Sequence, residues 1–249
     1  MTTAKQDPQV SGEQDADADA DADADANAET ETVKAARGLE DGRPSVRLRA
    51  ALAIGSAPAP DPDARNVEKL IERCAVEPDF SVREMLTWAL TRHAAHVTVP
   101  RLVAELGSGR PQARSQALHT LSKIGDRQAW PAITRALLSD AEDEVARTAW
   151  RAAVALVPEG EEPELARALA AQLGRGGRET RLSLSRALIA LGESAVPALL
   201  AAAADPDPRV RHHAAATERL LHDPDAGFDA AIEEAKRVVA LRDQPGGGA

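Results

Sequence analysis

Residues 99–126, VPRLVAELGSGRPQARSQALHTLSKIGD, contain the pattern on which most of this chain is built. The first part predicts a short helix that opens near Pro100, because a proline at an early helical position has no N–H to lose. Gly107-Ser108-Gly109 predicts a turn. A second helix is expected from about Pro111, with Gly125 as its C-terminal stop. Neither helix can bury its apolar stripe alone, so such hairpins must stack side by side.

The pattern recurs along the chain, and internal repeats of this length indicate a stack of helical hairpins. In each repeat a small or β-branched residue opens the second helix and is followed by a position that usually holds arginine. These arginine positions are Arg47, Arg83, Arg114, Ala146, Arg181 and Arg211. First helices have a marker of their own, seen in VPRLVAEL (99–106), WPAITRAL (130–137), EPELARAL (162–169) and VPALLAAA (196–203). Two markers in register predict six repeats with a period of about 33 residues.

An acidic residue lies six positions before the arginine position in four repeats: Asp41, Glu77, Asp140 and Asp205. Its carboxylate is placed to accept N–H bonds at the start of the second helix, and the arginine to reach a carboxylate of its own or the adjacent repeat. The sequence therefore predicts a charge ladder along the stack. Its members are Asp41, Arg47, Glu77, Arg83, Asp205 and Arg211. Ser108 and Arg175 replace the acidic residue elsewhere, and Ala146 replaces arginine, so we expect looser coupling in the middle.

Composition and charge divide the chain into a body and its tails. Aromatic residues make up only 2% of the chain against 43% hydrophobic residues, which favours a helical core of Ala, Leu and Val. Residues 1–42 hold 12 of the 40 acidic residues and 3 of the 30 basic ones, so they carry −9 of the net charge of −10. Four segments are expected: a disordered acidic Asp/Ala-rich tail (1–35), a solenoid of about six helical pairs (36–224), a capping helix (225–242) and a disordered tail (243–249).

The sequence carries no recognisable targeting or membrane signal. Residues 1–33 have neither a basic start nor an apolar run, so they do not predict a secretory signal. No stretch approaches the ~18 apolar residues of a membrane helix. The single Cys74 cannot form an internal disulfide, which is typical of a reducing compartment and predicts a cytoplasmic protein.

The segments DPDPRVRHHAAA (205–216) and SKIGD (122–126) combine an Asp-containing turn, a Val-Arg opening of the second helix and an Ile-Gly-Asp close. They resemble HEAT repeats, particularly the short HEAT-like repeats found in phycobilisome lyases. The resemblance covers about residues 39–223. It implies an all-α fold, a right-handed α-α superhelix (HEAT-like α-solenoid) whose second helices line a concave face. Similar repeats occur in scaffolds, bilin lyases, an iron-dependent hydroxylase and DNA-repair glycosylases, so the resemblance implies no single activity.

The concave face is where we expect a partner to bind. Positions one and five residues after the arginine position point away from the core, and they include Trp88, His119, Arg147, Arg151 and Arg186. An aromatic anchor, an imidazole and a row of guanidiniums suit an acidic peptide of another protein. The sequence thus predicts a non-catalytic interaction module or scaffold. The alternatives are that this row is only solvated, or that the acidic tail of the chain itself visits it.

Catalytic and metal sites find little support in the sequence. His93 and His96 lie three residues apart but lack acidic or cysteine partners at ligand spacing, and no His-Glu pair of the kind by which HEAT-like hydroxylases hold iron is present. Histidines are therefore expected at surface or capping positions, and Cys74 as a small buried residue. No catalytic residue, metal or cofactor is expected.

Two enzyme classes remain as alternatives through the resemblance. A bilin-lyase-like enzyme, or a chaperone of a tetrapyrrole-carrying protein, would hold the tetrapyrrole beside Trp88 and His119, although no residue is diagnostic of it. A HEAT-like DNA glycosylase needs a strongly basic surface. Residues 43–249 carry a net charge of only −1 and the tail is acidic, which disfavours nucleic acid as a partner.

Overall fold

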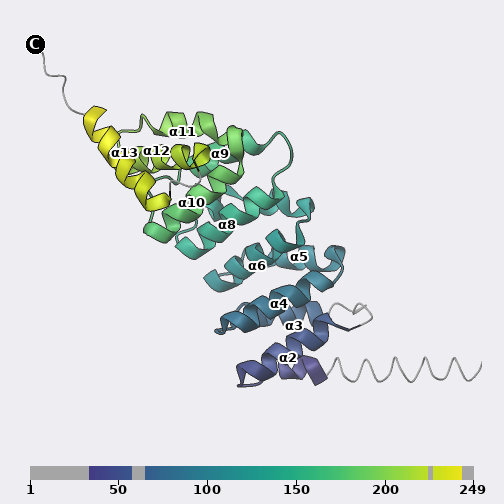
Figure 1. Cartoon of the computed structure of the whole chain (residues 1–249). Helices are drawn as coiled ribbons and strands as arrows, with labels where there is room; N and C mark the ends of the chain where they lie inside the picture. The colour runs from purple at the N-terminus through teal and green to yellow at the C-terminus, as the bar shows by residue number, and fades with distance from the viewer. Residues whose placement is uncertain (1–33, 58–64, 224–226, 243–249) are drawn as a thin grey trace, which may run out of the picture. The chain divides into compact units, whose positions relative to one another are not determined.

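The computed structural model describes residues 34–57, 65–223 and 227–242. All regular secondary structure in these ranges is helical, and the helices follow one another as hairpins (Figure 1). The predicted all-α solenoid class is therefore confirmed. The acidic tail and the C-terminal tail predicted from the sequence lie outside the described residues, apart from the helical residues 34 and 35.

Each repeat contributes a second helix that starts close to its arginine position. These helices are α2 (Pro44–Gly55), α4 (Phe80–Arg92), α6 (Pro111–Ile124), α8 (Asp143–Leu156), α10 (Arg178–Ala190) and α12 (Pro208–His222). The first helices are a short helix over residues 34–38, α3 (Arg65–Cys74), α5 (Ala95–Glu105), the 3-10 helix η1 (Arg127–Ala132) with α7 (Arg135–Leu138), α9 (Glu162–Ala170), and η2 (Gly192–Ala195) with α11 (Val196–Ala202). The last helix is α13 (Phe228–Arg242).

The repeats, expected as one array over residues 36–224, form two compact units. Of the described residues, unit 1 comprises 34–57, 65–73 and 77–93. Unit 2 comprises 74–76, 94–223 and 227–242. The six repeats are thus shared between two bodies, each with its own core.

In unit 1 the second helices α2 and α4 pack side by side. Val82, Leu86 and Leu90 recur at helical spacing along α4 and are fully buried, so they form its core stripe. At the end of α2, Gly55 approaches α4 closely. A Cβ on Gly55 would stand 2.5 Å from Cζ3 of Trp88 and 2.8 Å from Cα of Ala89, so only glycine permits this contact.

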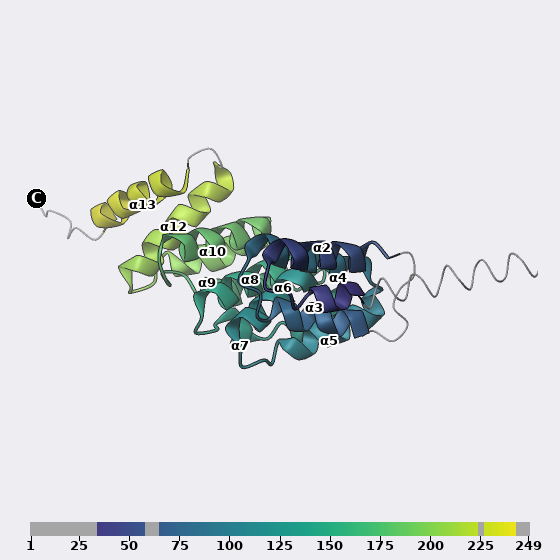
Figure 2. The same ribbon diagram turned by 90° about the horizontal axis from the view of Figure 1, so that it is seen from below.

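In unit 2 the helices α6, α8, α10 and α12 pack in succession (Figure 2). The centre of this unit is α8, where four alanines are fully buried and let its neighbours approach closely: Ala146, Ala149, Ala152 and Ala153. Trp150 fills the remaining space and is also fully buried. Its indole Nε1 donates to the Leu138 carbonyl at 2.8 Å, so the polar atom of this large side chain is satisfied in the core.

The first helix of the 99–126 pattern starts earlier than the sequence predicts. It begins at Ala95, and Pro100 lies inside α5 rather than at its start. There the proline lacks the N–H that would bond the His96 carbonyl. The helix continues because its packing tolerates one lost bond, and the Arg101 guanidinium donates to the nearby Val97 carbonyl at 2.9 Å.

The segment 130–137, expected as one helix, is divided between η1 and α7. Two side chains explain the break, because each one caps a separate helical start. Asp126 Oδ1 accepts from the Gln128 N–H at 2.9 Å, and Thr134 Oγ1 accepts from the Leu137 N–H at 3.4 Å. The expectation of a single helix here was wrong, because Thr134 caps a new helix start within the segment.

The last helix covers the end of unit 2. Phe228, Ala231, Ile232 and Ala235 on α13 pack against Ala216 and Leu220 on α12. Glu233 and Lys236, on the other side of α13, are exposed. An apolar inner face and a polar outer face are what the terminal element of a repeat stack requires.

Candidate functional site

A recurring turn precedes the second helices. In four repeats the carboxylate six positions before the arginine position accepts the N–H of the residue two further on, which fixes the chain as it enters the helix. These bonds join Asp41 to Arg43 (2.8 Å), Glu77 to Asp79 (2.9 Å), Asp140 to Glu142 (2.9 Å) and Asp205 to Asp207 (2.8 Å). In the third repeat the Ser108 hydroxyl takes this role and accepts from the Arg110 N–H at 3.3 Å.

The arginine closes the same turn from the helix. Its guanidinium donates to the backbone carbonyl six residues earlier, which would otherwise be unpaired in the turn. Four repeats share this bond: Arg47 to Asp41 (2.8 Å), Arg83 to Glu77 (3.0 Å), Arg114 to Ser108 (2.8 Å) and Arg211 to Asp205 (3.0 Å). In these four repeats the arginine is therefore structural, and its side chain is already engaged within its own repeat.

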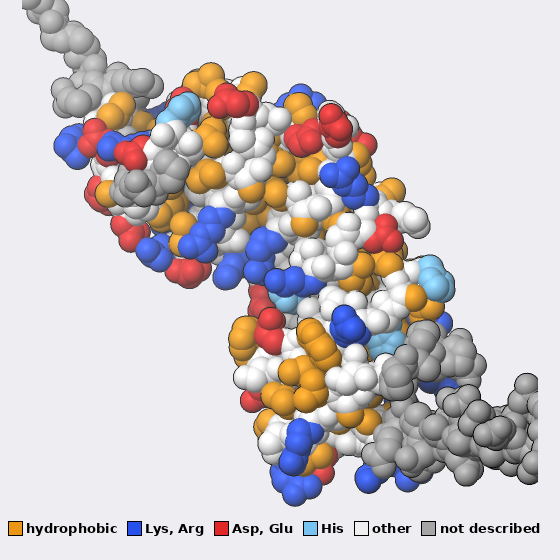
Figure 3. Space-filling model, turned by 45° about the vertical axis from the view of Figure 1, so that its right-hand side comes forward, with side chains coloured by type: hydrophobic (Ala, Val, Ile, Leu, Met, Phe, Trp, Pro, Cys, Tyr) orange, Lys and Arg blue, Asp and Glu red, His pale blue; other side chains and the backbone are white. Residues whose placement is uncertain are grey.

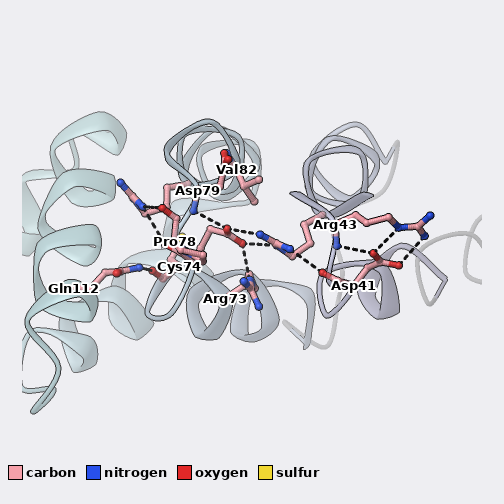
Figure 4. A network of polar contacts seen from close by, with 11 residues as sticks. Asp41, Arg43, Arg73, Cys74, Pro78, Asp79, Val82 and Gln112 are labelled. Atoms are coloured by element: carbon pink, nitrogen blue, oxygen red, sulfur yellow. Dashed lines mark hydrogen bonds and ion pairs between the residues drawn. The ribbon is translucent and has the colours of Figure 1, made fainter. Parts of the chain in front are cut away.

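The strongest link between repeats in unit 1 joins Arg47 to Glu77 (Figure 4). Nε and Nη2 of Arg47 donate to the two carboxylate oxygens at 2.7 Å each. Arg73 Nε adds a third bond at 2.7 Å, and Glu77 is fully buried. Burial by itself raises the pKa of Glu77, but the bonds from Arg47, the Asp79 N–H and Arg73 outweigh it and lower the pKa from 4.5 to about 2.

In unit 2 the fourth repeat receives an arginine from each neighbour. Arg114 donates to Asp140 at 3.0 and 3.1 Å, in the same direction as Arg47 to Glu77. Arg175, which occupies the acidic position of the fifth repeat, points the other way. Its Nε donates to Asp143 at 2.9 Å, and its Nη2 donates to the Asp140 carbonyl. The Asp140 carbonyl, which an arginine at position 146 would bond, is therefore bonded by Arg175 of the following repeat instead.

The residues expected to contact a partner fall into both units. Trp88 lies on α4 of unit 1 and is 37% exposed. The other four lie on consecutive second helices of unit 2: His119 on α6, Arg147 and Arg151 on α8, and Arg186 on α10. In the space-filling view, Lys and Arg side chains gather over the middle of the described chain (Figure 3).

Contacts between the helices orient part of this basic row. Ser115 Oγ on α6 lies 3.2 Å from Thr148 Oγ1 on α8, and both side chains are buried. Arg151 Nη2 donates to the same Thr148 oxygen at 3.2 Å. Arg147 is half-buried and Arg186 is exposed, and neither forms an ion pair with a described residue. Arg147 and Arg186 thus offer guanidiniums that pair with no carboxylate among the described residues.

One polar residue of the core was missed by the sequence reasoning. His213, expected at a surface or capping position, is fully buried on α12. Gly174 N–H donates to its Nδ1 at 3.1 Å, so Nε2 carries the proton and faces the Arg181 carbonyl and Ser185 Oγ, each at 3.0 Å. Burial lowers the pKa of His213 from 6.5 to about 4, partly offset by the bond to Arg181.

Neither a metal cluster nor a membrane span stands out in the described ranges. No group of three or more His, Cys, Asp or Glu side chains there is arranged to hold a metal ion. No single described helix has both the length and the apolar character needed to cross a membrane. A bent pair, Arg178–Ala190 with Gly192–Ala202, meets these criteria only when its two halves are taken together across a 119° bend.

Tandem helical hairpins with a capped turn define an α-solenoid repeat protein. Residues 67–155 match the family model described as HEAT repeats, so this part of the chain consists of HEAT repeats. No curated protein matches the chain. Among solved structures, human deoxyhypusine hydroxylase in complex with glycerol is similar, with 21% identity and a TM-score of 0.44, and the match covers 88% of this chain and 99% of that one.

Proposed function

We propose that this HEAT-repeat protein is a non-catalytic interaction module whose basic row in unit 2 (His119, Arg147, Arg151 and Arg186) binds an acidic segment of another protein. The observation that carries the proposal is the contrast between two sets of arginines. Arg47, Arg83, Arg114 and Arg211 at the turns are engaged by carbonyls, and Arg47 and Arg114 by carboxylates as well. Arg147 and Arg186 form no ion pair with any described residue.

Guanidiniums without carboxylate partners favour an acidic ligand for a physical reason. A guanidinium–carboxylate pair forms two parallel charge-assisted hydrogen bonds, and several such pairs along adjacent helices add specificity. Because the body of the chain is nearly neutral, this local excess of positive charge also sets the direction in which a charged partner approaches. The proposal includes a cytoplasmic location, because the single cysteine, Cys74, is buried and has no second cysteine in the chain with which to form a disulfide.

The test uses the full chain and a fluorescein-labelled peptide, Glu-Ala-Glu-Ala-Glu-Ala-Glu-Ala-Glu-Ala, in a fluorescence anisotropy titration. Arg147→Glu combined with Arg186→Glu should weaken binding at least about tenfold. Arg127→Glu combined with Arg219→Glu makes the same charge change at exposed positions of unit 2 outside the row, and should change the affinity little. Equal losses in both double variants would leave only non-specific attraction and contradict the proposal.

A further inference from the structure

Among the exposed large apolar side chains of unit 1, Leu52 and Trp88 lie on adjacent second helices. Leu52 on α2 is 42% exposed and Trp88 on α4 is 37% exposed. Each lies five residues after the arginine position of its repeat, so the two occupy equivalent places on helices that pack side by side. Leu48 and Met85, one turn earlier on the same helices, are half-buried and extend this apolar surface.

The Trp88 ring is held in place rather than left to rotate freely. Its Cζ3 lies 2.5 Å from the place that a Cβ of Gly55 would occupy, so the ring rests directly on the backbone of α2. An aromatic side chain fixed in this way loses little conformational entropy when a ligand covers it. Aromatic anchors of this kind carry a large share of the energy in protein interfaces.

Charged side chains flank the apolar surface. Arg49 lies one turn before Leu52 on α2, and Arg92 lies one turn after Trp88 on α4. Both are exposed, and neither forms an ion pair with a described residue. Glu84 is an exposed acidic residue one turn before Trp88, so positive charge prevails.

We propose that this surface, made of Leu48, Arg49, Leu52, Met85, Trp88 and Arg92 and called here the Trp88 surface, binds a second kind of ligand. The ligand is an acidic segment of a partner protein that carries one bulky apolar side chain. The apolar side chain covers Leu52 and Trp88, and carboxylates on either side pair with Arg49 and Arg92. This site is separate from the basic row of unit 2, which is proposed to recognise an acidic segment by charge alone.

Charge also decides against two other occupants. In a symmetric contact with a second copy, the arginines that border one patch would face those of the other, and like charges would repel. The Asp-Ala segment of this chain, residues 15–26, brings carboxylates but no side chain larger than alanine between them, so it cannot cover the tryptophan. A partner segment with both a bulky apolar side chain and flanking carboxylates can cover Leu52 and Trp88 and pair with Arg49 and Arg92 at the same time.

The experiment uses the peptide Glu-Asp-Glu-Asp-Leu-Phe-Glu-Asp-Glu-Asp and a matched peptide with Ser-Ser in place of Leu-Phe. The full chain carries Arg147→Glu and Arg186→Glu, so that binding at the basic row of unit 2 is removed. We expect the Leu-Phe peptide to bind at least about tenfold more tightly than the Ser-Ser peptide in this background. Leu52→Glu, and separately Arg49→Glu with Arg92→Glu, should each abolish that difference.

A control variant and an NMR measurement show whether the peptide binds at the Trp88 surface. Leu200→Glu changes a more exposed leucine, 54% exposed on α11 of unit 2, and should leave the affinity unchanged. The chain has three tryptophans, so the indole N–H resonances identify the site by NMR. The Leu-Phe peptide should shift the resonance of Trp88, assigned with Trp88→Phe, and not those of Trp130 and Trp150. Equal binding of both peptides, or no shift at Trp88, would overturn the proposal without affecting the basic row.

Discussion

Arg47 and Glu77, 30 residues apart in sequence, form a buried ion pair in which two nitrogens of one guanidinium bond the two oxygens of one carboxylate. The pair joins the second helix of the first repeat to the turn of the second repeat. Because the same guanidinium also donates to the Asp41 carbonyl at 2.8 Å, one side chain closes its own turn and holds the next one. Loss of Arg47 would therefore affect both repeats.

Arg47→Ala should lower the free energy of unfolding by about 4 kcal/mol, because it leaves the buried Glu77 carboxylate with an incomplete set of partners. Urea denaturation followed by circular dichroism measures the change. Arg43→Ala is the matched control, since Arg43 pairs with Asp41 at the surface and its side chain is 75% exposed. The control should have a far smaller effect, and comparable losses in the two variants would argue against a special role for the buried pair.

Gly55→Ala should destabilise unit 1 by about 2 kcal/mol, because the added Cβ meets both the Trp88 ring and the backbone of Ala89. The ring can move, but Cα of Ala89 at 2.8 Å cannot yield without a shift of α4. Gly42→Ala is the control, since nothing lies within 4 Å of a Cβ at that position. Thermal unfolding of both variants provides the comparison, and a Gly55→Ala protein as stable as wild type would show that the two helices can separate freely.

The buried His213 predicts a loss of stability in mild acid. Its pKa is about 4 in the folded chain against 6.5 when exposed, so between these values the unfolded chain binds more protons than the folded one. The stabilisation is complete above pH 6.5 and is lost as the pH falls towards 4. The full loss amounts to about 3 kcal/mol. Glu77, whose pKa falls from 4.5 to about 2, contributes a separate loss at lower pH.

Urea denaturation at a series of pH values between 4 and 7 tests this expectation. His213→Gln should flatten the dependence, because glutamine does not titrate. His222→Gln provides the control, since His222 is exposed and bonds only the Glu218 carbonyl among described residues. If His213→Gln keeps the wild-type slope while His222→Gln loses it, the assignment of the buried group is wrong.

Much of the fold could be predicted because its determinants are local. Gly125 adopts φ 73° and ends α6, as its place after an apolar stripe indicates. The contacts of the turns follow from acidic and arginine residues six positions apart. Pro100 and the segment 130–137 were misread because helix starts there depend on tertiary packing and on the cap from Thr134. A single residue in the sequence seldom indicates which of two possible helix starts packing and capping will favour.

The candidate site was only partly accessible from sequence. Helical spacing places Trp88, Arg151 and Arg186 at exposed positions. Spacing could not reveal that the chain divides into two units, because that depends on contacts between distant residues. Spacing also could not show that His213 is buried, because two adjacent histidines do not indicate which of their rings packs into the core. The Gly55–Trp88 contact likewise depends on how closely two helices approach.

The reversed direction of Arg175 has a consequence for how this repeat array can grow. At its turn, the fourth repeat receives Arg114 from the third repeat at Asp140 and Arg175 from the fifth repeat at Asp143. Ala146 stands at the position where an arginine would continue this ladder. A tandem copy of that repeat alone would place two acidic turns in succession, with alanine at the position between them that supplies the guanidinium in other repeats. Lengthening of the array by duplication of this single repeat is therefore disfavoured. A block of the third, fourth and fifth repeats keeps Asp140 and Asp143 together with Arg114 and Arg175, so it can be inherited as one piece.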